Sequence, residues 1–109
     1  MATVMPHKLN TSDIKSKIAR ELTSHPVQWY GAPLESCLVE PTRCPYEDGS
    51  NEGETIELWL VFEERPETKD GYKIVYDDDM DQFGLATPGK TKDVFLGYCG
   101  TFVSTLEGM

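Results

Sequence analysis

The sequence has few basic residues, and this shortage argues against the commonest polyanionic partners. Its 109 residues include 10 Lys and Arg against 19 Asp and Glu, which gives a formal net charge of −9 at pH 7. Proteins that bind DNA or RNA need a basic surface for the phosphates, and anionic membranes attract basic segments. We therefore expect no nucleic-acid partner and no membrane partner, whereas a basic protein would associate quickly with so acidic a chain.

Long apolar segments are also absent. No stretch approaches the roughly 20 apolar residues of a membrane-spanning helix, and the segment MATVMPHKLN has no apolar signal core. We expect a cytoplasmic protein on these grounds. The three cysteines, Cys37, Cys44 and Cys99, are then free thiols, and a disulfide between the first two would require export.

Histidine is scarce as well, which weakens the case for zinc or histidine-based catalysis. Neither His7 nor His25 stands at a standard zinc-ligand spacing from another histidine or a cysteine. Cys99 and His25 could form a nucleophilic pair, but Cys99 falls on the apolar stripe of a predicted helix, where a buried and inert thiol is expected. We expect no catalytic residue, no metal and no cofactor.

Hydrophobic periodicity divides the chain into the elements of one small domain. The length suits a single α+β domain over residues 1–109, in which residues 1–10 form a flexible arm. Apolar side chains recur at helical spacing within residues 12–23, which predicts a helix with Thr11 or Ser12 as its N-cap. These apolar positions are Ile14, Ile18 and Leu22.

Four strands are predicted to follow a connector at residues 26–36. Their ranges are 36–40 with a continuation at 42–46, then 55–64, 72–77 and 82–87. Pro41 and Pro45 lack amide donors, which places the first strand at a sheet edge. The second is apolar on both faces and therefore central. Because the connections are short, we expect an antiparallel four-stranded meander.

The C-terminal segment predicts a second helix. Its apolar residues fit a period of 3.6, with Asp93 or Thr91 at the start, and Gly97 and Gly100 would let the helix approach the sheet. They are Phe95, Leu96, Cys99, Phe102, Val103 and Leu106. A strand over 94–99 is the main alternative. The predicted fold class is thus α+β, a four-stranded antiparallel meander sheet flanked by an N-terminal and a C-terminal helix.

The stretch IVYDDDMDQFGLAT places a cluster of carboxylates in a hairpin turn. It contains Asp77, Asp78, Asp79 and Asp81. An EF-hand calcium loop would need glycine where Gln82 stands and a bidentate acid where Pro88 stands, so that motif fails. A looser calcium or magnesium site, a solvated turn whose aspartates bind turn amides, and an acidic docking face all stay open.

The docking interpretation assigns six partner-binding residues. They are Asp77, Asp78, Asp79, Asp81, Glu63 and Glu64. The two glutamates precede the neighbouring turn, which would lie at the opposite end of a simple two-stranded hairpin. Both ends of the sheet would then be acidic.

The segment GLATPGKT, residues 84–91, matches the phosphate-loop pattern G-x-x-x-x-G-K-[ST]. A working phosphate loop lies between a buried parallel strand and a helix. Here the predicted flanks are short antiparallel strands, Pro88 precedes the second glycine, and the adjacent aspartates would repel a triphosphate. We therefore treat the match as formal.

The segment ELWLVFEERPETKDGYKIVYDDDMDQFGLA, followed by FLGYCGTFVSTLEGM, resembles small acidic bacterial proteins of unassigned function. Some proteins of this kind act as immunity proteins encoded beside toxins. The resemblance covers about the last half of the chain and carries over no functional residue. It implies a cytoplasmic, non-catalytic protein that occludes the active site of a toxin.

Charge and resemblance together predict a small acidic binding protein of immunity or inhibitor type, docking on a basic protein partner such as a toxin. An acidic domain can imitate the phosphate field that the basic cleft of a nuclease recognises. The alternative is a divalent-metal-dependent or small-ligand enzyme that uses the Asp77–Asp81 carboxylates. A third is a homodimer formed through an exposed sheet edge or the C-terminal helix.

Overall fold

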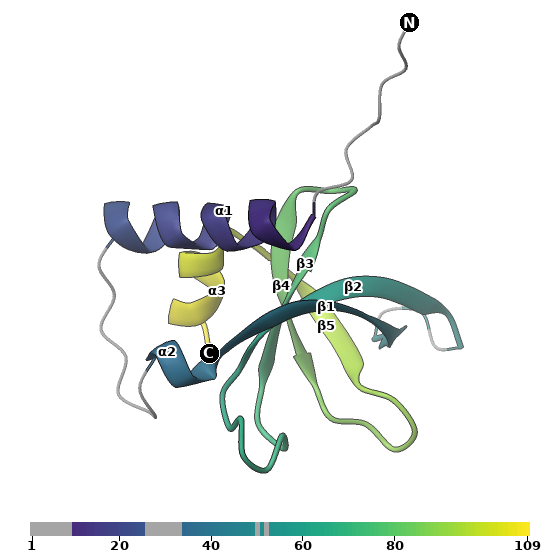
Figure 1. Ribbon diagram of the computed structural model, residues 1–109. Coiled ribbons are helices and arrows are strands. Elements are labelled where there is room, and N and C mark those ends of the chain that lie inside the picture. Colours follow the sequence, from purple (N-terminus) through teal and green to yellow (C-terminus); the bar gives the residue numbers. More distant parts are fainter. Residues whose placement is uncertain (1–9, 26–33, 50, 52) are drawn as a thin grey trace, which may run out of the picture.

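The computed structural model describes residues 10–25, 34–49, 51 and 53–109, and shows three helices packed against five strands (Figure 1). The elements are α1 (Thr11–Ser24), α2 (Leu34–Cys37), β1 (Leu38–Asp48), β2 (Thr55–Glu63), β3 (Lys73–Asp77), β4 (Gln82–Thr87), β5 (Val94–Gly100) and α3 (Phe102–Glu107). None of these helices is long and apolar enough to cross a membrane. Residues 26–33 of the predicted connector, and the predicted arm except for Asn10, lie outside the described residues, whereas residues 34–36 of that connector belong to α2.

The predicted α+β class with an antiparallel sheet and flanking helices is confirmed, but the sheet has five strands and not four. Neighbouring strands pair antiparallel in chain order, and β5 closes the sheet into a barrel by pairing parallel with β1. That closing contact joins Glu47 to Val94 and Asp48 to Phe95. It involves only the last two residues of β1, so the part of β1 that carries Pro41 and Pro45 pairs with β2 alone, in keeping with the edge position that its prolines predicted.

The predicted C-terminal helix is wrong over its first half, where the alternative of a strand is right. Residues 94–100 form β5, and the helix α3 begins only at Phe102, with Thr101 as its N-cap. The register between β4 and β5 shifts twice. Gly97 and Gly100 have φ values of 153° and 94°, which glycine tolerates best, so these glycines serve an irregular strand and not a helix packed on a sheet.

Helix α1 forms where its periodicity predicted it. The N-cap is Asn10 in place of Thr11 or Ser12. Its side chain accepts a hydrogen bond from the Asp13 amide at 2.8 Å, and the Asp13 carboxylate accepts one from the Asn10 amide at 3.2 Å. The two isoleucines, Ile14 and Ile18, are buried in the core.

The sheet is buried on both faces, and each face has its own apolar core. Inside the barrel, one residue from each strand contributes to a small cluster formed by Tyr46, Leu58, Val75, Ala86 and Phe95. On the outside, a larger cluster joins the sheet to the helices and includes Ile14, Ile18, Ile74, Tyr76, Phe83 and Phe102. Successive residues of β3 alternate between the two clusters, as the period of a strand requires. The apolar character of both faces of β2, read from the sequence, has this origin.

Candidate functional site

Asp77, the last residue of β3, fixes the acidic turn. One carboxylate oxygen accepts hydrogen bonds from the amides of Asp79 at 2.9 Å and Met80 at 3.3 Å. The other accepts a hydrogen bond from the Tyr98 hydroxyl on β5 at 2.5 Å. Burial, followed by this hydrogen bond, raises the pKa of Tyr98, so the tyrosine stays a donor at any ordinary pH. Asp77 is 7% exposed and therefore organises the turn from within.

Asp81 ties the same turn to α1. Its carboxylate accepts a hydrogen bond from the Tyr76 hydroxyl at 2.7 Å and pairs with the Lys17 ammonium at 3.1 Å. The hydrogen bond from Tyr76, and then Lys17, hold the pKa of Asp81 below its ordinary value. Asp81 is therefore a fixed and permanently charged carboxylate near neutral pH.

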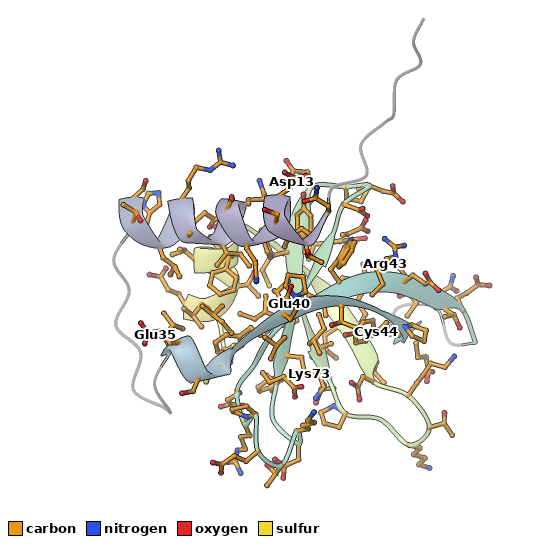
Figure 2. The ribbon with its side chains drawn as sticks, viewed as in Figure 1. Asp13, Glu35, Glu40, Arg43, Cys44 and Lys73 are labelled. Carbon is orange, nitrogen blue, oxygen red and sulfur yellow. The ribbon has the colours of Figure 1, made fainter. Side chains whose placement is uncertain are left out.

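Asp78 is buried, with 8% of the residue exposed, and is only partly compensated. One of its oxygens lies 3.5 Å from the guanidinium of Arg43 on β1. The other has no hydrogen-bond partner among the residues that the structure describes. Arg43, labelled in Figure 2, also lies over the ring of Trp59 at 5.6 Å and contacts Glu57 at 3.5 Å, so its charge is shared.

Tyr76, Asp78 and Asp81, together with residues of α1, line an open groove of about 650 Å³ between α1 and the β3–β4 turn. We call it the acidic groove. Its charged lining comprises four carboxylates, Asp13, Asp78, Asp79 and Asp81, and two cationic side chains, Lys17 and Arg20. Figure 1 shows the hairpin tip rising beside the first turn of α1, and Figure 2 places Asp13 there. Carboxylates outnumber cationic side chains in this lining, which gives the groove a negative potential.

Glu63 and Glu64 lie at the opposite end of the barrel, as the sequence predicted. Glu63 is opposite Lys73, the first residue of β3, whereas Asp77 is the last. The Lys73 ammonium and the Glu63 carboxylate form an ion pair at 3.1 Å, and their side chains are 5% and 6% exposed. The Lys73 ammonium also donates a hydrogen bond to the Lys69 carbonyl at 2.9 Å. Glu64 accepts a hydrogen bond from the Tyr72 amide at 3.0 Å. Both glutamates thus have roles in the fold at this end.

The six predicted partner-binding carboxylates therefore have unequal access to a partner. Three of them, Glu63, Asp77 and Asp78, are less than a tenth exposed, and Glu64 is half-buried. Asp79 and Asp81 are exposed. The sequence reasoning missed Asp13 and Lys17, which stand four residues apart on one face of α1. That spacing was available, but nothing local indicates that this face meets the acidic turn.

The formal phosphate-loop match has the wrong structural context. Gly84 lies within β4, and Lys90 lies in a loop that leads into the strand β5 and not into a helix. A Cβ atom at Gly84 would meet the carbonyl oxygen of Gly97 and, at 2.7 Å, the Phe95 ring. The glycine is therefore explained by close packing of two strands, and the phosphate-loop interpretation is wrong.

The cysteines do not form a catalytic or metal centre with the described histidine. Cys37 is buried, Cys44 is half-buried and Cys99 is exposed, and none of the three forms a disulfide. The prediction that Cys99 lies on a buried helical stripe is wrong, because it belongs to β5 next to the second register shift. His25 ends α1 and is exposed, whereas His7 lies outside the described residues.

No protein-family model matches this chain, and neither a curated protein nor a solved structure is significantly similar to it. The resemblance to small acidic bacterial proteins thus stays a prediction. The geometry and charge of the acidic groove are therefore the basis for a functional proposal.

Proposed function

We propose that this chain is a small acidic binding protein without catalytic activity, of immunity or inhibitor type, that docks on a basic protein partner through the acidic groove. One observation carries the proposal: exposed carboxylates gather on a rigid frame at one end of the molecule. Asp13, Asp79 and Asp81 are its exposed members. This set replaces the six predicted contacts, three of which are buried.

Rigidity supports the proposal because a fixed carboxylate loses little entropy when it binds a cation. Asp81 is held by Tyr76 and Lys17, and the turn that carries Asp79 is held by Asp77. A net charge of −9 would further steer a basic partner toward the molecule before contact. Such steering raises association rates more than it raises affinity.

A catalytic role for the same carboxylates has less support. A general acid needs a carboxyl group whose pKa is raised toward neutrality. The pKa of Asp81 is lowered instead. Asp77 is occupied by the turn amides and Tyr98. The metal-dependent enzyme is therefore the second candidate. The homodimer has less support too, because two chains that each carry a net charge of −9 repel each other.

The test compares two variants with the same change in net charge. The first, Asp13→Asn with Asp79→Asn and Asp81→Asn, neutralises the groove. The second, Glu35→Gln with Glu54→Gln and Glu107→Gln, neutralises exposed carboxylates elsewhere. The partner is identified by affinity capture from the native cell, purified, and its association rate with each variant is measured at two salt concentrations.

We expect a cationic partner whose association slows with salt and with the groove variant, by about tenfold or more, while the matched variant changes it little. If the two variants slowed association equally, the partner would be responding to the net charge of the whole molecule and not to the groove, which would contradict the proposal. A captured partner that is not cationic would contradict it as well.

A further inference from the structure

Three consecutive carboxylates beside the acidic groove are arranged closely enough for one cation. Asp77, Asp78 and Asp79 each have a carboxylate oxygen, and these three oxygens all lie within 4.8 Å of one another. Calcium binds oxygen ligands at about 2.3–2.6 Å, so two ligands on opposite sides of one ion stand at most about 5 Å apart. This spacing is compatible with one calcium ion held by all three carboxylates after small side-chain adjustments.

A second observation points to a ligand independently of this clustering. The side chain of Asp78 is 5% exposed, and Oδ2 is buried without a hydrogen-bond partner among the described residues. Arg43 approaches only the other oxygen, at 3.5 Å. Leaving a buried charged acceptor uncompensated is costly. An ion is one of the few ways in which such an oxygen is satisfied in native proteins.

The two flanking aspartates suit the role of ligands in different ways. Asp77 is held in place by three hydrogen bonds from Asp79, Met80 and Tyr98. Since a carboxylate has about four acceptor positions, one remains for a metal. Asp79 is exposed, and its carboxylate has no hydrogen bond or ion pair among the described residues, so it can turn toward an ion at little cost.

We propose that Asp77, Asp78 and Asp79 form a divalent-cation site that prefers calcium. Water and turn carbonyls complete the six to eight positions that calcium uses. Magnesium fits less well, because it requires ligands at about 2.0–2.1 Å in near-octahedral geometry. Because no dedicated calcium loop surrounds the three carboxylates, we expect a dissociation constant at the weak end of the range for protein calcium sites, about 10⁻⁴–10⁻³ M.

The experiment titrates the chain alone with calcium chloride in a calorimeter and follows terbium luminescence in parallel. Terbium replaces calcium, and Tyr98 is hydrogen-bonded to Asp77, which brings a sensitising ring close to the ion. Asp79→Asn is the main variant, because this exposed side chain has no role in the fold. Asp78→Asn tests the buried oxygen, and Asp70→Asn is the control at the other end of the barrel.

We expect calcium to bind the wild type and the control equally, to bind at least tenfold more weakly to Asp79→Asn and Asp78→Asn, and to outcompete magnesium. Absence of binding heat up to about 10 mM calcium, together with absence of sensitised terbium luminescence in calcium-free buffer, would overturn the site. Equal binding by Asp79→Asn and the control would also overturn it, because the ion would then sense only overall acidity. No partner takes part, so the outcome is separate from that of the proposed docking function.

Discussion

The Glu63–Lys73 ion pair is the clearest test of the energetics of this fold. Lys73→Met keeps most of the volume of the lysine but removes the charge that compensates Glu63, whose side chain is 6% exposed. Asp93, at 3.8 Å from the same ammonium, also loses its partner. Breaking a buried ion pair in this way costs about 3–5 kcal/mol. That is a large part of the stability of about 5–15 kcal/mol that is typical of a single domain.

Urea unfolding followed by tryptophan fluorescence measures this loss. With an m-value of about 1.5 kcal/mol per molar, the midpoint should fall by about 2–3 M. The control is Lys15→Met, which breaks the ion pair between Lys15 and Glu40. That pair is shorter, at 2.7 Å, but its side chains are 56% and 64% exposed. We expect the control to lose no more than about 0.5 kcal/mol, because water screens an exposed pair.

A double variant separates the cost of an unpaired charge from the value of the pair itself. Glu63→Met combined with Lys73→Met removes both charges and should recover most of the stability that Lys73→Met loses, because replacing a buried pair with apolar residues is often neutral. A single variant that loses less than about 1 kcal/mol would refute the reasoning, since it would mean that Glu63 is not desolvated. So would a double variant that is no more stable than the single one.

Two further predictions concern the strands around the acidic turn. Gly84→Ala should lower the free energy of unfolding by about 1–3 kcal/mol in urea melts, because its Cβ would meet the Gly97 carbonyl and the Phe95 ring; unchanged stability would contradict the close packing. Tyr76→Phe should raise the pKa of Asp81 toward its ordinary value in a carboxyl NMR titration. Because that pKa is depressed in the fold, the associated stability is present at neutral pH and lost as pH falls through the folded value, so wild type and variant should converge in acid.

The missed fifth strand shows how two bulges can imitate a helix. Ala86 of β4 pairs with Phe95 of β5, and Gly84 pairs with Tyr98, so three positions on β4 face four positions on β5. Phe95 and Tyr98 consequently contact each other, with ring centroids 4.9 Å apart. A contact between side chains three residues apart is usual in a helix and not in a regular strand. Helix α1 and the β3–β4 hairpin were predictable because the hydrophobic period of each is regular: α1 is one continuous helix, and the register between β3 and β4 does not shift.

The candidate site was predictable in position but not in accessibility. Four aspartates in a turn are visible in the sequence, yet which of them are buried depends on side chains from distant elements. Tyr98 reaches Asp77 from β5, Lys17 reaches Asp81 from α1, and Arg43 reaches Asp78 from β1. These contacts are set by tertiary structure, and no local pattern in residues 74–87 encodes them.

Polar side chains stand at both ends of the barrel interior. Every residue of β3 is buried, and because strand residues alternate, Lys73 and Asp77 point to the same side as the interior residue Val75. Lys73 pairs with Glu63 at one end, and Asp77 accepts a hydrogen bond from the Tyr98 hydroxyl at the other. Five buried apolar side chains pack inside the barrel, so its interior is a hydrophobic core and not a ligand-binding cavity. Any partner or ligand of this protein therefore binds to the outer surface of the barrel or its helices.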